Sequence, residues 1–396
     1  MSDNLSLFPA TRAAALARLE AFIPQAGRVY AERRNYDSGG EFKTGVSMLS
    51  PYLRHRLISE AEVVSAVLQT HSPSQAEKFI QEVCWRSYWK GWLQLRPAVW
   101  ADTLALVASD RASLSSNQAR ALANAEAGQT GIECFDDWAQ ALVRTGYLHN
   151  HARMWLASIW VFTLKLPWSL GADWFLRHLI DGDAASNTLS WRWVAGLQTE
   201  GKTYLARPDN IEKYTEGRYR PTGLATEAPA QPPRHKPPVQ ALPTLNSPTP
   251  NIPSLQLIHS EDFSAASWLP QNAVAETWVV AGGVGERWPW STAGQAFCQA
   301  AADDVAAGIN GPVERVDVLH ADAVIEHCHA LGLRQVITSE APVGPLADGL
   351  RALSTALADA GIVLCQQRRE WDQMAWPRAT KGFFAFKACI PDLIGL

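Results

Sequence analysis

The chain has 396 residues, enough for two or three domains that each bury a core. Hydrophobic residues make up 47% and charged residues 19% of the chain, as in globular proteins and unlike intrinsically disordered ones. We find no signal peptide and no apolar run long enough to span a bilayer, so we expect a cytoplasmic protein without membrane contact.

Charge is spread unevenly along the chain, whose net charge is −4. Residues 1–220 contain 24 basic and 22 acidic residues, whereas residues 251–396 contain 9 and 16. A nucleic-acid partner would therefore meet the N-terminal part, through a local basic patch. The six Cys lack paired spacing, so we expect reduced core thiols and no metal site.

Residues 10–23 are predicted to form a short first helix because apolar side chains recur along one stripe. Farther on, Ser47 and Ser50 stand just before Pro51, at the start of another helix. Serine hydroxyls and free amide groups at a helix start bind anions. The segment favours an anion site, although ordinary N-capping would explain either serine alone.

Residues 76–96 carry the next strong helical pattern. Glu82 and Arg86 lie four residues apart on it, a spacing that also suits an ordinary surface ion pair.

The densest cluster of polar residues lies in residues 145–193. Asn150, Arg153 and Met154 share one face of a predicted helix. Asp181 and Asp183 follow among apolar residues, where charges are costly to bury unless they are paired or bound to a polar ligand. A buried ion pair that only joins helices is the alternative to a ligand site.

A Pro-rich linker is predicted over residues 221–254, between a helical domain of residues 1–220 and an α/β domain of residues 255–396. The last domain alternates apolar strands with helices, a pattern that predicts a doubly wound parallel sheet. The glycines at 282–285 lack a dinucleotide-binding register, so we do not favour such a site there.

The polar cluster and its surroundings resemble the flavin-binding domain of the photolyase/cryptochrome family. The family pattern TGW-HNR-RM, HLIDGD-A-N and W-W matches residues 145–154, 178–187 and 191–193 in order and spacing. The family element F/W-xxE-xxWR matches Phe79 through Arg86, and the box TS-LSPYL matches residues 47–53. The threonine of that box falls at Val46, so either Thr44 substitutes for it or one hydroxyl contact is lost.

The resemblance implies an all-helical domain that binds FAD. The implied cofactor-binding residues are Tyr30, Thr44, Ser47, Leu49, Ser50, Phe79, Arg86, Asn150, Arg153, Asp181, Asp183 and Asn187. The implied substrate-binding residues are Arg34, Glu82, Trp85, Met154 and Trp193, and the implied catalytic residues are Glu82, Asn150, Trp168 and Trp191.

Trp191 and Trp168 match the inner and middle members of the family's electron relay. No aromatic residue stands near Ser115, where the outermost member is expected, and Trp100, Trp155 or Trp160 could substitute for it.

Light-driven repair of cyclobutane pyrimidine dimers in UV-damaged DNA is the function that the resemblance implies first. A cryptochrome-like blue-light photoreceptor without repair activity is the alternative, favoured by departures from the family pattern at Val46, Arg56, His151 and near Arg207. A flavin-free scaffold is a third hypothesis. In all three, the sequence leaves the oligomeric state open.

Residues 255–396 resemble the antenna domain of the same family, which usually precedes the flavin domain. Here the order is swapped, and an unrelated flavodoxin-like domain is the alternative. The sequence does not specify whether a second chromophore is bound.

Overall fold

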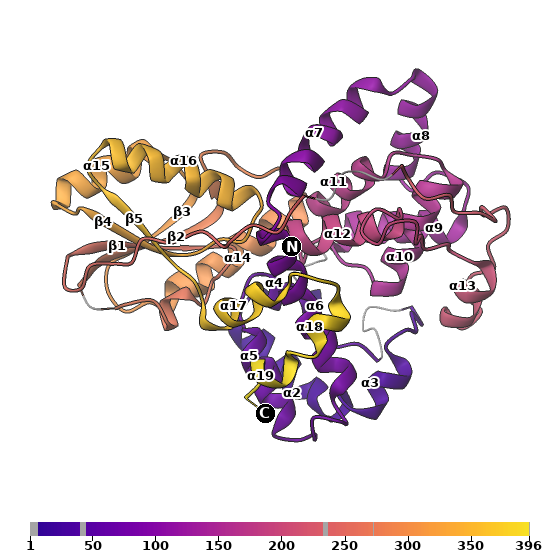
Figure 1. The fold of residues 1–396 in the computed structure, drawn as a ribbon, viewed down its shortest axis with the longest axis horizontal. Coiled ribbons are helices and arrows are strands. Elements are labelled where there is room, and N and C mark those ends of the chain that lie inside the picture. Colours follow the sequence, from indigo (N-terminus) through magenta and orange to yellow (C-terminus); the bar gives the residue numbers. More distant parts are fainter. Residues whose placement is uncertain (1–6, 40–44, 233–236, 272, 396) are drawn as a thin grey trace.

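A helical part and a sheet-containing part lie side by side in the computed structural model, which describes residues 7–39, 45–232, 237–271 and 273–395 (Figure 1). Most of the helical part comes first in the chain. Its helices are α2 (Arg12–Phe22), α3 (Arg28–Arg33), α4 (Ser50–Arg54), α5 (Glu60–Leu68), α6 (Glu77–Gln94), α7 (Ala98–Ser113), α8 (Ser116–Glu126), α9 (Glu133–Thr145), α10 (Asn150–Ser158), α11 (Trp168–His178), α12 (Ala184–Val194) and α13 (Pro208–Tyr214).

Local signals explain where several of these helices begin and end. Thr11 caps α2, and its side chain accepts a hydrogen bond from the Ala14 amide at 3.1 Å. A π-helical turn, η2 (Ile159–Thr163), follows α10, and α11 begins directly after Pro167. Trp92, Trp155 and Trp160 are almost completely buried, so much of the tryptophan content fills the helical core.

Five parallel strands form the sheet, in the order β3-β2-β1-β4-β5. The strands are β1 (Ser254–His259), β2 (Val274–Val284), β3 (Val313–Leu319), β4 (Gln335–Ser339) and β5 (Val363–Gln367). Helices α15 (Ala321–Leu331) and α16 (Pro345–Asp359) cover one face and α14 (Thr292–Ala307) the other (Figure 1). The predicted doubly wound sheet is therefore confirmed.

The last helices of the chain return to the helical part, which we did not predict. They are α17 (Glu370–Ala375), η4 (Trp376–Arg378), α18 (Phe383–Lys387) and α19 (Ile390–Leu393). The Tyr88 hydroxyl on α6 donates to the Lys381 carbonyl at 3.0 Å, and Phe386 is buried against the Tyr88 ring. Helix α6 is therefore covered by a segment nearly 300 residues away in the chain.

Side chains of the helical part fill the carboxyl ends of β1 and β4, where the strand order reverses and ligands bind in many α/β folds. Arg54 donates to Glu261 at 2.6 Å, and Gln94 donates to Glu340 at 3.3 Å. The Lys90 ammonium lies 3.8 Å from the Glu261 carboxylate, and both side chains are buried. In this fold, that end of the sheet serves as a contact between the two parts.

Arg56, one of the departures from the family pattern, has an unusual backbone conformation and is buried. Its φ of 50° lies in the left-handed region, where a glycine costs least. The buried Arg56 guanidinium donates to Asp372 at 2.7 Å and lies 3.6 Å from Asp262. Attraction to these acids offsets the backbone cost.

His55 is buried at the same contact, with Nδ1 2.7 Å from the Ser260 carbonyl oxygen and Nε2 2.9 Å from that of Ile180. Burial, together with the neighbouring Arg54, lowers the pKa of His55 to about 3, although both carbonyls act in the opposite direction.

Acidification is therefore expected to destabilise the fold through His55. The folded state keeps this ring neutral while the unfolded chain binds a proton below about pH 6.5, so the free energy of unfolding should fall by about 1 kcal/mol per such histidine near pH 5.5. Urea titrations at neutral pH and near pH 5.5 measure this loss. His55→Gln should show a smaller loss than the wild type; equal losses would contradict the assignment.

No helix in the described part of the chain is long and apolar enough to cross a membrane. Within the same residues, no group of three or more His, Cys, Asp or Glu side chains is arranged to hold a metal ion. The six cysteines are unpaired, and five of them are buried.

Candidate functional site

Arg153 on α10 and Asp181, just before α12, form a two-pronged ion pair at the centre of the candidate site. The guanidinium donates to the two carboxylate oxygens at 3.0 and 2.8 Å, and Nε donates to the Leu148 carbonyl at 2.9 Å. Burial alone would raise the pKa of Asp181, but Arg153 and a hydrogen bond from Ser50 lower it. The carboxylate is therefore held in its charged form.

Arg86 on α6 forms a second pair, with Asp183. It also lies 3.4 Å from the Asp181 carbonyl. Asp183 caps α12 by accepting from the Ser186 amide at 2.7 Å. Burial acts to raise the pKa of Asp183, but Arg86 and neighbouring cations lower it. The two predicted Asp residues thus bind different arginines from different helices.

Hydroxyl groups border this pair of arginines. Ser50, the first residue of α4, hydrogen-bonds Asp181, and the Ser47 hydroxyl accepts from the Leu49 amide at 3.4 Å. Leu49 is buried. Thr44, the proposed substitute for the family threonine, lies outside the described residues.

Glu82 stands one helical turn before Arg86, and the Arg34 guanidinium lies 3.8 Å from its carboxylate. The Glu82 side chain keeps 40% of its surface exposed. Partial burial of the carboxyl group nevertheless raises the pKa of Glu82, and the positive charge of Arg34 partly counteracts this rise. This carboxyl binds a proton more readily than an ordinary glutamate.

Three predicted cofactor-binding residues are mainly engaged in the core. Tyr30 and Phe79 are buried and meet edge to face at 5.2 Å. Asn187 is buried on α12, and its amide donates to the Ala172 carbonyl of α11 at 2.7 Å.

Asn150 is the first residue of α10 and is exposed, while Arg153 and Met154 on the same helix are half-buried. The predicted stripe therefore exists and is only partly covered by protein. His151 stacks between Trp155 and Tyr214, with ring centroids 4.9 and 5.2 Å away. It occupies the place where the family pattern has an arginine, and burial lowers its pKa.

Two predicted substrate-facing tryptophans already have stacking partners. Trp85 stacks on Phe383 of α18 with ring centroids 3.6 Å apart and planes 10° apart. Trp193 stacks on Tyr204 at 5.5 Å. Both indoles remain half-buried.

Trp160 contacts Trp191, the inner of the two tryptophans predicted for electron transfer. Its ring centroid lies 6.0 Å from that of Trp191, and its Nε1 donates to the Pro167 carbonyl at 3.0 Å. Pro167 directly precedes Trp168. Trp160 was one of three substitutes considered for the outermost relay position, and the structure places it beside the inner one instead.

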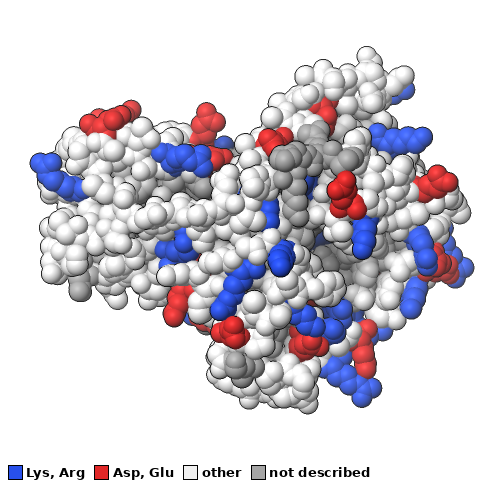
Figure 2. Space-filling view, viewed as in Figure 1, with Lys and Arg blue, Asp and Glu red and all other residues white. Residues whose placement is uncertain are grey.

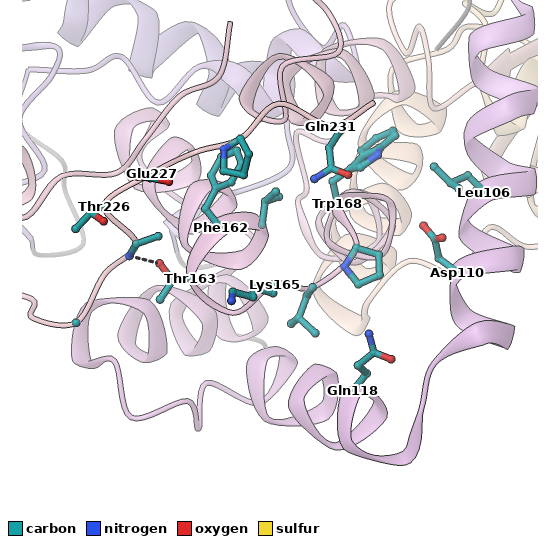
Figure 3. Close-up of a pocket in the computed structure, with 16 residues that line it drawn as sticks. Leu106, Asp110, Gln118, Phe162, Thr163, Lys165, Trp168, Thr226, Glu227 and Gln231 are labelled. Carbon is teal, nitrogen blue, oxygen red and sulfur yellow. Dashed lines mark hydrogen bonds between the residues drawn. The ribbon is translucent and has the colours of Figure 1, made fainter. Parts of the chain in front are cut away.

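A pocket of about 750 Å³ lies next to Trp168 (Figure 3). Gln118 of α8 and the segment 223–231 line it, and the Ala225 amide at its edge donates to Thr163 at 3.0 Å. Apart from Trp168, the pocket includes none of the predicted site residues, so it is separate from the site around Arg153.

Two contacts of the site escaped the sequence interpretation. The Tyr147 ring lies 5.4 Å from the Arg153 guanidinium. Tyr147 stands six residues before Arg153 within the segment that matches the family pattern, and this position could have indicated the contact. Phe383 covers Trp85 from the far end of the chain, and no local sequence signal indicates this contact.

The donor set fits FAD. Ser47, Ser50 and Arg86 can hold a diphosphate by charge-assisted bonds. Arg153 and Asn150 offer polar groups for a ring system and are not fully covered. The Ser186 hydroxyl, beside the capping Asp183, is buried without a protein partner among the described residues. Such a group commonly finds its partner in a ligand or water.

Comparison with known proteins gives a consistent result. Residues 79–218 match the family described as the FAD binding domain of DNA photolyase. The match includes Arg86, Asn150, Arg153, Asp181 and Asp183, and it begins after Ser47 and Ser50. Over residues 79–218 the chain is therefore similar to the flavin-binding region of photolyases.

Particular relatives are deoxyribodipyrimidine photo-lyases. That of Streptomyces griseus is 31% identical over 210 residues, which cover 49% of this chain and 45% of the relative. That of Escherichia coli is 30% identical over 210 residues, which cover 52% of this chain and 43% of the relative. A bacterial class III photolyase structure from Agrobacterium tumefaciens is 26% identical, has a TM-score of 0.42, and covers 52% of this chain and 43% of its own. The chain thus spans less than half the length of the curated relatives it matches.

Proposed function

We propose that this protein binds FAD and uses light to split cyclobutane pyrimidine dimers in UV-damaged DNA, the reaction of a deoxyribodipyrimidine photo-lyase. One observation carries the proposal: the Arg153–Asp181 and Arg86–Asp183 pairs meet within the segment that matches the photolyase FAD-binding family. When bound, reduced FAD would supply the electron that opens the dimer after absorbing light.

Each site residue then has a physical role toward the cofactor. Ser47, Ser50 and Arg86 would hold the diphosphate by hydrogen bonds and charge. Arg153, fixed by Asp181, would lie beside the isoalloxazine ring, and Asn150 would face its N5. A neutral amide there adds no negative charge beside a reduced anionic flavin. Tyr30, Phe79, Leu49 and Asn187 would support this site from the core.

Toward DNA, Glu82 is the principal residue. Its carboxyl group, whose pKa is raised by its surroundings, would hydrogen-bond or protonate the flipped dimer. Arg34 lies beside it and would contact a backbone phosphate. Met154, Trp85 and Trp193 would pack against the lesion's rings. Trp191 and Trp168 would return electrons to the cofactor.

The sheet-containing part is proposed to be an antenna-like domain placed after the flavin domain. Because Arg54, Lys90 and Gln94 occupy the carboxyl ends of β1 and β4, a second chromophore would need a different site. Its identity stays open in this proposal.

The decisive experiment is repair in vitro. Purified protein with fully reduced flavin is illuminated with blue light in the presence of thymine-dimer DNA, and the remaining dimers are counted. Loss of dimers in the light but not in the dark supports the proposal. No loss in the light would reject it.

Asn150→Asp is expected to keep FAD bound and to lower the repair yield by roughly tenfold or more. The substituted carboxylate has the same size but brings negative charge toward N5. Flavin absorbance of the purified variant checks binding, and dimer counting checks repair. Unchanged yield would contradict the placement of Asn150.

A cryptochrome-like photoreceptor is the second candidate, favoured by one observation of this structure. Phe383 covers one face of Trp85, so that face cannot receive the rings of a dimer. His151, in place of an arginine, also removes one cationic contact to DNA. A protein that binds FAD and responds to light, but does not repair dimers, would fit this candidate.

A further inference from the structure

Phe384 is the most exposed of the large hydrophobic residues in the described part of the chain. It is 89% exposed, whereas the next, Leu331, is 52% exposed. Single exposed apolar residues are common, but a nearly bare phenylalanine ring loses its hydrophobic stabilisation entirely. Among the described residues, this ring is therefore free to contact a binding partner.

Helix α18 holds Phe384 firmly in place. The preceding Phe383 is buried in its face-to-face stack on Trp85, and the following Phe386 is completely buried. Lys387 on the same helix forms an ion pair with Glu77 of α6 at 2.7 Å. The exposed ring thus projects from a rigid helix rather than from a mobile loop.

Phe384 stands next to the substrate side of the candidate site. Its neighbour Phe383 touches Trp85, which lies one helical turn after Glu82 on α6. In Figure 1, α18 lies against α6 near the middle of the molecule. Phe384 is thus one residue away from the ring that covers Trp85, a predicted substrate-binding residue.

The charge around Phe384 favours an anionic partner. Residues 376–390 contain Arg378, Lys381 and Lys387; Arg378 pairs with Asp392 and Lys387 with Glu77, whereas Lys381 forms no ion pair with a described residue. Lys381 is exposed three residues before Phe384. Blue and red side chains lie close together around the centre of the face shown in Figure 2. An aromatic ring beside an exposed lysine can bind a nucleic-acid strand through base stacking and a phosphate contact.

We propose that Phe384 stacks on an unpaired DNA base beside the bound lesion, while Lys381 contacts a neighbouring phosphate. Flipping a dimer out of a duplex leaves unstacked bases next to it, and an aromatic wedge can replace the lost stacking. This inference rests on the proposed function, because it requires DNA as the substrate. It adds a substrate-positioning residue from the C-terminal segment of the chain.

Binding of a fluorescently labelled duplex with one thymine dimer tests the proposal. Phe384→Ala is expected to raise the dissociation constant by about tenfold, the range typical of one lost base–aromatic stack. Phe384→Trp should bind like the wild type, and its added fluorescence should be quenched by the DNA. Leu331→Ala, at an exposed apolar position on α15, is the matched control and should leave binding unchanged.

Three outcomes would overturn the inference. The first is a Phe384→Ala variant that binds dimer DNA as tightly as the wild type, which leaves the proposed function intact. The second is a wild-type dimer in gel filtration that Phe384→Ala converts to monomers, which would assign the ring to a contact between two copies. The third is a wild type that binds no dimer DNA, which would reject the proposed function as well.

Discussion

Asp181→Asn is expected to yield a protein that no longer binds FAD and that unfolds about 3 kcal/mol more easily. The asparagine has nearly the same shape, but it leaves the Arg153 guanidinium without its counter-ion. We expect the lower end of the range for broken buried pairs because the Arg153 side chain keeps 23% of its surface exposed. Flavin absorbance after reconstitution and urea titration measure the two effects.

Asp209→Asn is the matched control for this change. Asp209 also pairs with an arginine, Arg207, at 2.7 Å, but the Arg207 side chain is 64% exposed and the Asp209 side chain 68%. Exposed pairs contribute about 0–1 kcal/mol, so stability and flavin binding should persist in Asp209→Asn.

The contribution of Asp181 to stability should depend on pH. Because the pKa of folded Asp181 is lowered, its stabilising effect is complete above about pH 4 and is lost as the pH falls further. The gap between wild type and Asp181→Asn should close in acid; a gap of equal size there would contradict the ion-pair assignment.

Arg56→Gly is expected to lower the free energy of unfolding by about 2–4 kcal/mol. In the wild type, the Arg56 guanidinium lies 2.7 Å from the Asp372 carboxylate and 3.5 Å from that of Glu60. Removing the guanidinium leaves both carboxylates buried without this cation, which typically costs about 3–5 kcal/mol. Glycine recovers about 1 kcal/mol because φ at this position is positive. Chemical denaturation measures the net loss.

Two comparisons make the Arg56 result interpretable. Arg207→Gly removes an exposed arginine from its ion pair and should cost much less. Limited proteolysis of Arg56→Gly should show earlier cleavage between the helical and sheet-containing parts than in the wild type, because Asp262, which lies 3.6 Å from Arg56, follows strand β1 of the sheet. A variant as stable as the wild type would show that Arg56 is dispensable for joining the two parts.

Local sequence patterns predicted the helices and strands well because secondary structure depends largely on the apolar and polar pattern of neighbouring residues. The alternation of apolar strands with helices in residues 255–396 predicted the parallel sheet, and helix α6 followed from its periodicity. Residue types indicated that Asp181 and Asp183 would be paired or bound to a ligand if buried, and in the structure Asp181 pairs with Arg153. The assignment of these residues to a flavin site came from the family resemblance.

Contacts between distant segments could not be predicted in the same way. The stack of Phe383 on Trp85 joins residues almost 300 positions apart, and neither residue has a local signal for the other. Trp160 was considered for the surface end of a relay, but packing of η2 against α12 brings it to Trp191. The filling of the sheet's carboxyl end by Arg54 and Lys90 likewise depends on how the two parts dock.

The absorption spectrum of the purified protein after incubation with FAD tests the central claim most directly. We expect flavin absorption bands that stay with the folded wild type and with Asp209→Asn through gel filtration, and that are absent from Asp181→Asn. A folded, colourless wild type that retains no added FAD would contradict the account, because Arg153 and Asp181 would then only join two helices.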